Sequence, residues 1–230
     1  MSQKIYSKNK EAQIIVAPSD HIILKEVAFI KTINKALHFT SEHDVLLTLG
    51  IKPSRPDTGY GYIQHNESEV GGIYKVKAFT EKPSIELAKT FYESGDFLWN
   101  SGTFIWRVEV VLDAFKKMLP DIYAAFKSCE PYFFTNEEAD KLKTAYTQCK
   151  SISIDYGVME GADNVYVVPA DFGWSDIGTW TSLYKKKKKD YLQNAVKGNA
   201  VHIYDSSDNM IVAPDDKLVV VNGLKDYCLI

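Results

Sequence analysis

The spacing of hydrophobic and polar residues changes repeatedly along the chain and predicts strands that alternate with helices. Continuous apolar runs at 13–17 and 45–50 are typical of strands that are buried on both faces of a sheet. Residues 21–37 carry apolar side chains at helical spacing. The segments 60–64 and 73–79 alternate apolar and polar residues, which favours half-buried antiparallel strands joined by a turn.

The pattern in the rest of the chain predicts mainly helices up to residue 160 and only strands from residue 200 onward. Further helices are expected at 83–92 with Ser84 as N-cap, 110–118, 122–126, 136–146 with Asn136 as cap, and 154–160. Further strands are expected at 104–106, 165–169, 200–204, 210–213 and 218–221. This order predicts an α/β fold with a mixed, mostly parallel sheet flanked by helices, followed by a small C-terminal β segment. We expect the α/β domain at 1–194 and the β segment at 195–230.

The composition excludes several classes of protein. A chain of 230 residues with 45% hydrophobic and 25% charged residues can bury one large core, and its net charge of −3 gives no reason to expect nucleic-acid binding. The cysteines Cys129, Cys149 and Cys228 have no metal-ligand spacing and are expected as free thiols in a reducing cytoplasm. No apolar run approaches the roughly 20 residues of a membrane helix, so no membrane association is expected.

Five short motifs carry the candidate chemistry. In chain order they are P-S-D-H at 18–21, G-Y-G-Y-I at 59–63, F-T-E-K-P at 79–83, W-N-S-G at 99–102 and D-F-G-W-S-D-I-G-T-W at 171–180. Asp20 follows one predicted strand, and Asp176 lies on a glycine-rich turn after another. Acids at the carboxyl ends of strands meet at one edge of an open α/β sheet, where they suit Mg²⁺ that bridges phosphates.

Together, in this order, the motifs resemble the sugar-phosphate nucleotidyltransferases, and within them most closely the mannose-1-phosphate guanylyltransferases. The resemblance extends from Ile14 to the C-terminus. It implies a nucleotide-diphospho-sugar transferase-like fold. It also implies a reaction in which GTP and α-D-mannose 1-phosphate give GDP-mannose and pyrophosphate with Mg²⁺ as cofactor.

The resemblance also implies a role for each candidate residue. Asp20 and Asp176 would hold Mg²⁺, Lys82 would bind the sugar phosphate, and Asp155 would lie near the sugar. Glu81, Asn100 and Gly61 would bind the sugar hydroxyls. Asn100 offers both a donor and an acceptor, and Gly61 exposes its backbone. Each residue also has a simpler interpretation: Asp20 and Asp155 as helix caps, Glu81 and Lys82 as an exposed charge pair, and Gly61 as a strand bulge.

The chain departs from the family at its beginning, where no glycine-rich loop of the type G-G-x-G-x-R-x-x-P is recognisable. We therefore expect an open sheet edge that is covered by self-association, by a partner chain or within a longer polypeptide. We do not expect this chain alone to turn over GTP, because no other segment offers a ring of N–H donors for a triphosphate. A related enzyme for another sugar or nucleotide remains an alternative, as does an inactive subunit that binds a nucleotide-sugar.

Overall fold

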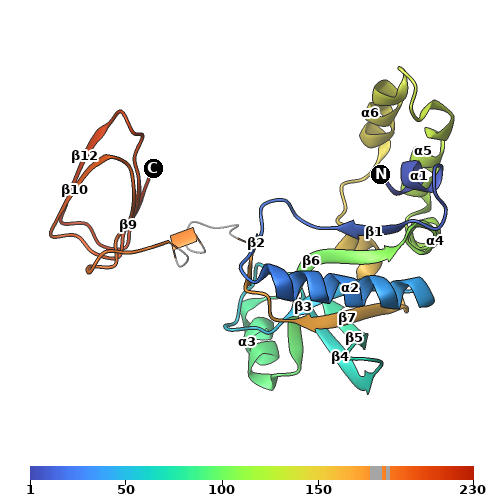
Figure 1. Ribbon diagram of the computed structural model, residues 1–230, viewed down its shortest axis with the longest axis horizontal. Helices are drawn as coiled ribbons and strands as arrows, with labels where there is room; N and C mark the ends of the chain where they lie inside the picture. The colour runs from blue at the N-terminus through green and yellow to red at the C-terminus, as the bar shows by residue number, and fades with distance from the viewer. Residues whose placement is uncertain (177–182, 185–186) are drawn as a thin grey trace. The chain divides into compact units, whose positions relative to one another are not determined.

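The computed structural model of the protein describes residues 1–176, 183–184 and 187–230, which form two compact units (Figure 1). The first unit contains residues 1–19 and 23–174. The second contains residues 20–22 and the described residues from 175 to 230. The short strands β2 (Ile22–Ile23) and β8 (Trp174–Ser175) pair with each other in a two-stranded sheet.

A six-stranded sheet with the order β1-β6-β3-β7-β5-β4 forms the centre of the first unit. Its strands are β1 (Gln13–Val16), β3 (Leu46–Ile51), β4 (Tyr62–Glu69), β5 (Tyr74–Thr80), β6 (Phe97–Arg107) and β7 (Val165–Ala170). β3 and β7 are parallel, and the other described pairings are antiparallel. The mixed α/β class is confirmed, but the sheet is not mostly parallel, because β6 lies between β1 and β3 and runs against both.

Alternation along the central strands divides the core into two layers. Leu47 and Leu49 of β3 pack on one face of the sheet with α2 (Glu26–Glu42), which Figure 1 shows running alongside β7. Leu46 packs on the opposite face, together with residues of α4 (Val108–Met118) and of the π-helical turn η2 (Asp155–Met159). All three leucines are fully buried, as the continuous apolar run of this strand predicts.

Three predicted elements differ from the observed ones. β1 was expected to be buried on both faces, but it is an edge strand that pairs with β6 alone among the described strands, and Ile15 and Val16, which point to opposite faces, are 43% and 44% exposed because little packs over them. The helix expected from residue 21 begins at Glu26, since Ile22 and Ile23 form β2 instead. β6 begins at Phe97 rather than at residue 104, so the polar W-N-S-G motif lies within a strand.

The remaining helices pack on β6, on α4 or on one another. They are α1 (Ser2–Tyr6), which was not predicted, α3 (Ile85–Ser94), α5 (Pro120–Lys127), α6 (Glu138–Gln148) and the 3-10 turn η1 (Glu130–Tyr132). The predicted cap of α3 is confirmed, because the Ser84 side chain accepts a hydrogen bond from the Leu87 N–H. The predicted Asn136 cap is wrong, since α6 starts two residues later without a side-chain cap. Among the described residues, no helix combines the length and apolar character needed to cross a membrane.

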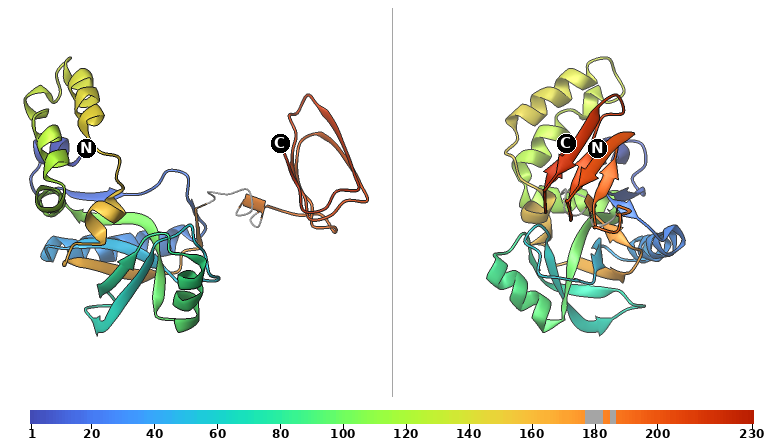
Figure 2. Two further views of the ribbon diagram at one scale, coloured as in Figure 1. Left: turned by 180° about the vertical axis from the view of Figure 1, so that it is seen from behind. Right: turned by 90° about the vertical axis from the view of Figure 1, so that its left-hand side faces the viewer.

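The second unit confirms the predicted C-terminal β segment. β9 (Ala195–Lys197), β11 (Met210–Val212) and β13 (Cys228–Leu229) form one parallel sheet, and β10 (Ala200–Tyr204) and β12 (Leu218–Asn222) form another. The right-hand view of Figure 2 shows these strands side by side. Buried Asn194 and Asn209 link successive turns: Asn209 donates to Asn194 Oδ1, and Tyr227 N–H donates to Asn209 Oδ1. These bonds satisfy amide groups that would otherwise be costly to bury.

Candidate functional site

Buried polar side chains gather in the first unit where β3, β6 and η2 meet. Asn100 on β6 is 8% exposed, and its Oδ1 accepts a hydrogen bond of 2.8 Å from the hydroxyl of fully buried Thr48 on β3. Its Nδ2 donates to Asp155 Oδ1 over 2.9 Å, and its backbone N–H donates to the Gly61 carbonyl over 2.8 Å. The Asn100 amide therefore has one fixed orientation, with its donor side toward Asp155.

Glu81 completes this group of residues. It directly follows β5, and its side chain is 11% exposed. Among the described residues, no hydrogen-bond partner is found for its buried Oε2 atom. A Cβ atom added to Gly61 would collide with that oxygen and would lie 3.3 Å from Asn100 Cβ. Gly61 thus leaves space for the carboxyl group. Thr48, Gly61, Glu81, Asn100 and Asp155 are called the Glu81 cluster below.

Burial and like charge shift the acids of the Glu81 cluster in the same direction. Burial and then the Asp155 carboxylate raise the pKa of Glu81 from 4.5 to about 7, with Lys82 opposing the shift and Glu160 adding to it. Burial also raises the pKa of Asp155, although the hydrogen bond from Asn100 lowers it in part. A carboxyl group that titrates near neutral pH can donate a hydrogen bond when protonated and accept one when ionised.

Lys82 places a cation at the mouth of the cluster. Its side chain is 61% exposed, and its Nζ lies 3.8 Å from Glu81 Oε1. Its backbone has a φ of 45°, in the left-handed region that residues with a side chain seldom adopt. The adjacent residues Glu81 and Lys82 differ in environment: the first is held inside, and the second is accessible to an anion from solvent.

Two residues that the sequence analysis did not single out hold the main chain here. Glu160 Oε1 accepts a 3.0 Å hydrogen bond from the Glu81 N–H, and the Tyr156 hydroxyl donates to the Glu81 carbonyl over 3.3 Å. Thr48 was missed as well. The available signal for Tyr156 and Glu160 was their place in the I-D-Y-G-V-M-E segment around Asp155. Asp155 itself contacts Asn100, which its interpretation as a simple helix cap did not include.

The two aspartates expected to hold Mg²⁺ both belong to the second unit, so they are described apart from the Glu81 cluster. Asp20 is exposed and Asp176 is half-buried. Asp171, the first acid of the glycine-rich motif, belongs to the first unit and pairs with Lys25 at 3.0 Å. Residues 177–180 of this motif lie outside the described residues. Within the part of the chain that is described, no three His, Cys, Asp or Glu side chains converge as a metal site.

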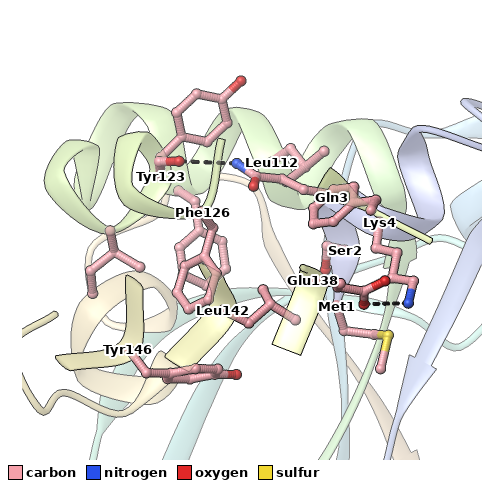
Figure 3. Close-up of a pocket in the computed structure, with 13 residues that line it drawn as sticks. Met1, Ser2, Gln3, Lys4, Leu112, Tyr123, Phe126, Glu138, Leu142 and Tyr146 are labelled. Atoms are coloured by element: carbon pink, nitrogen blue, oxygen red, sulfur yellow. Dashed lines mark hydrogen bonds and ion pairs between the residues drawn. The ribbon is translucent and has the colours of Figure 1, made fainter. Parts of the chain in front are cut away.

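A large cavity in the first unit has a different character. It measures about 350 Å³ and lies among α1, α4, α5 and α6, with Leu112, Phe126 and Leu142 in its wall (Figure 3). At its edge Lys4 pairs with Glu138. We call it the α1–α6 cavity. Its apolar wall does not suit a sugar phosphate.

Comparisons with known proteins point in one direction. The family model described as nucleotidyl transferase matches residues 1–194. Mannose-1-phosphate guanylyltransferases of Salmonella typhimurium and Salmonella muenchen are 36% and 38% identical over 90% and 88% of this chain, which correspond to 43% of each relative. The chain thus spans less than half the length of these curated relatives. A Thermus thermophilus structure described as mannose-1-phosphate geranyltransferase superposes with a TM-score of 0.82 at 30% identity, over 97% of this chain and 64% of that one.

Proposed function

Because the chain belongs to the nucleotidyl transferase family, we propose that it supplies the sugar-phosphate half of a mannose-1-phosphate guanylyltransferase. In that reaction an oxygen of α-D-mannose 1-phosphate attacks the α-phosphorus of GTP. A new oxygen–phosphorus bond forms, the bond to the departing pyrophosphate breaks, and GDP-mannose results. Such a reaction asks the protein mainly to position two anions and to neutralise the charge between them.

One observation carries the proposal: the buried Glu81 Oε2 without a partner beside an oriented Asn100 amide and an accessible Lys82. A buried carboxyl oxygen without a hydrogen bond is costly, and a ligand hydroxyl would satisfy it. Lys82, at the mouth of the cluster, offers a compact charge for a phosphate. The cluster therefore fits a molecule that carries both hydroxyls and a phosphate. The relatives named as mannose-1-phosphate guanylyltransferases favour mannose as the sugar.

Mg²⁺ is part of the proposal, with Asp20 and Asp176 as its ligands. Both carboxylates are at least partly accessible to solvent. Mg²⁺ in nucleotide sites keeps several waters and needs one or two carboxylates besides the phosphates, so two aspartates are a suitable donor set. When bound, the ion would neutralise charge on the phosphates. Asp176→Asn should abolish Mg²⁺-dependent binding of GDP-mannose but preserve metal-free binding of mannose 1-phosphate, as measured by calorimetry.

We also propose that the open edge of β1 is covered by another polypeptide segment, from a second copy, a partner chain or a longer form of this protein. Ile15 and Val16 on β1 are about half exposed, and Val27 on the nearby helix α2 is 85% exposed. An edge strand flanked by apolar side chains readily pairs with another strand. The free thiols Cys129, Cys149 and Cys228 favour a reducing compartment, for which we propose the cytoplasm.

Calorimetry combined with an activity assay tests the proposed function. Wild-type protein should bind mannose 1-phosphate and GDP-mannose, and pyrophosphate release from GTP and mannose 1-phosphate should be measured in parallel. Binding without turnover would favour a sugar-nucleotide-binding subunit, and turnover with a different sugar phosphate would favour a related transferase. No binding of either ligand would contradict the proposal. Light scattering on the same samples tests whether the chain self-associates.

A further inference from the structure

We propose that Tyr156 and Glu160 are positioning residues that clamp the main chain of Glu81 and so fix where the Glu81 carboxyl group and the Lys82 ammonium group point. The consequence for ligand binding rests on the proposed function above. The clamp itself is a property of the first unit and can be tested without any ligand.

The end of β5 creates the need for such a clamp. Thr80 is the last residue of β5, where it pairs with Tyr62, so Glu81 has left the sheet ladder. Pro83 cannot donate a backbone hydrogen bond, and Lys82 has the unusual φ of 45°. A residue with a side chain keeps such a conformation only where its surroundings enforce it. The backbone around Glu81 must therefore be held by something other than the sheet.

Side chains of one turn supply the backbone hydrogen bonds that the sheet no longer provides at Glu81. Glu160 accepts a hydrogen bond from the Glu81 N–H, and the Tyr156 hydroxyl donates one to the Glu81 carbonyl. Both backbone polar groups of Glu81 are therefore bonded by side chains from the same short segment of the chain. Tyr156 is 51% exposed and Glu160 is exposed as well. Their contribution to the hydrophobic core is therefore small, and the contact with Glu81 is their main structural role.

The turn that carries the clamp is itself firmly anchored. Val158 and Met159, which lie between the two clamping residues, are almost completely buried in the core with α4. The turn is π-helical, a conformation frequent at functional sites. It also carries Asp155, which holds the Asn100 amide. One anchored turn thus orients both polar groups that would read the sugar, Asn100 directly and Glu81 through its backbone.

The charge of Glu160 has a second consequence. Three carboxyl groups, Glu81, Asp155 and Glu160, and one cation, Lys82, face each other here, and the Glu160 carboxylate contributes to the raised pKa of Glu81. A glutamine at residue 160 would keep an oxygen that accepts from the Glu81 N–H but would remove the charge. The pair of substitutions Glu160→Gln and Glu160→Ala therefore separates the effect of the hydrogen bond from the effect of the charge.

Amide hydrogen exchange and carboxyl titration by NMR give a readout without ligand. In Glu160→Ala we expect the Glu81 amide to lose its exchange protection, whereas Glu160→Gln should keep it. Both variants should lower the pKa of Glu81 slightly, because the like charge of Glu160 is gone, whereas burial and the Asp155 carboxylate, the larger causes of the raised pKa, remain. Glu93→Ala on α3 and Tyr191→Phe are exposed controls that should change neither quantity.

Calorimetry with mannose 1-phosphate gives the second readout. Glu160→Ala should weaken binding about tenfold and Tyr156→Phe about threefold, as expected for the loss of one positioning hydrogen bond, while Glu160→Gln stays within about twofold at pH 8. Unchanged Glu81 protection in Glu160→Ala would overturn the clamp. If the alanine variant does not fold, Glu160→Met, which keeps a side chain of similar length without a hydrogen-bond acceptor of the same kind, decides by the same exchange measurement. If wild-type protein does not bind mannose 1-phosphate, the proposed function fails, and exchange protection still decides the clamp.

Discussion

The Glu81 cluster and the α1–α6 cavity are two internal sites of the same unit, and they differ in what they leave unsatisfied. The cavity has a volume of about 350 Å³ and an apolar wall, and its ion pair Lys4–Glu138 is closed on itself. The one buried polar atom there without a partner among the described residues is the neutral amide oxygen of Gln3. The cluster instead buries a carboxyl oxygen of Glu81. Unmet charge, rather than empty volume, therefore identifies the place for a polar ligand.

The largest expected effect belongs to the apolar cavity and concerns stability alone. Leu112 on α4 is 9% exposed and belongs to the core as well as to the cavity wall. Leu112→Ala should lower the free energy of unfolding by about 2–5 kcal/mol, because a cavity that already exists becomes larger. Urea denaturation measures this loss. The affinity for mannose 1-phosphate should not change, and a parallel loss of affinity would show that the two sites are not independent.

Lys82→Ala should instead lower the affinity for mannose 1-phosphate and leave the stability almost unchanged. Removal of a charge-assisted contact costs about 1.5–3 kcal/mol, so the affinity for mannose 1-phosphate should fall roughly 10- to 100-fold, whereas binding of free mannose hardly changes. Stability should stay within about 0.5 kcal/mol, since Lys82 is mostly exposed. Calorimetry with both sugars measures the difference. Equal losses for mannose and its phosphate would mean that the whole site has collapsed.

Lys82→Arg sharpens the same point. A planar guanidinium group does not occupy the position of a compact ammonium group, so the arginine variant is not expected to restore the affinity for mannose 1-phosphate. If calorimetry showed wild-type affinity in the arginine variant, a positive charge near the mouth of the cluster would be sufficient and its position would not matter.

Gly61→Ala should have a smaller and more local effect. The added methyl group would collide with Glu81 Oε2, the end of a flexible side chain, and the backbone of Gly61 has no positive φ that would add strain. The Glu81 carboxyl group should therefore move, and the fold should remain intact. We expect about tenfold weaker binding of mannose 1-phosphate with a nearly unchanged unfolding midpoint. A large loss of stability without a loss of affinity would show that Gly61 serves packing only.

The strands of the central sheet show how much of the fold can be predicted from the sequence. The apolar periodicity of β3 predicts its burial, since Leu46, Leu47 and Leu49 are all covered. It does not predict that Ile15 and Val16 of β1, which point to opposite faces of the sheet, are exposed, because their exposure depends on which elements pack over these faces and not on the residues of the strand. The start of β6 was missed because a polar motif in a strand gives no alternation, although it brings Asn100 next to Thr48.

For the site, motif resemblance selected Gly61, Glu81, Asn100 and Asp155, which the fold brings together. Their assigned roles toward a sugar remain predictions. Thr48, Tyr156 and Glu160 act on these residues through hydrogen bonds between distant segments, for which local sequence has no pattern. The metal role of Asp20 and Asp176 also remains a prediction.

The smallest expected effect is the pH dependence of stability, and it comes from Glu81. Its pKa is about 7 in the folded protein and 4.5 as the ordinary value, so between these pH values the folded state binds a proton that the unfolded state does not. This contribution to stability is fully present below pH 4.5 and is lost as the pH rises through 7. Asp155, whose pKa is also raised, adds a change of the same sign, and Glu81→Gln isolates the part that belongs to Glu81.

Urea unfolding of wild-type protein and Glu81→Gln across pH 4.5–8 measures the difference between their slopes. Wild-type stability should decline more steeply than that of the variant, by a modest amount because the nearby Lys82 ammonium group favours the ionised form of Glu81. Glu93→Gln, on the exposed surface of α3, should keep the wild-type slope. Identical slopes for wild type and Glu81→Gln would mean that the carboxyl group is hydrated after all. The contrast between a buried carboxyl group without a partner in the cluster and the Lys4–Glu138 ion pair at the cavity would then no longer hold.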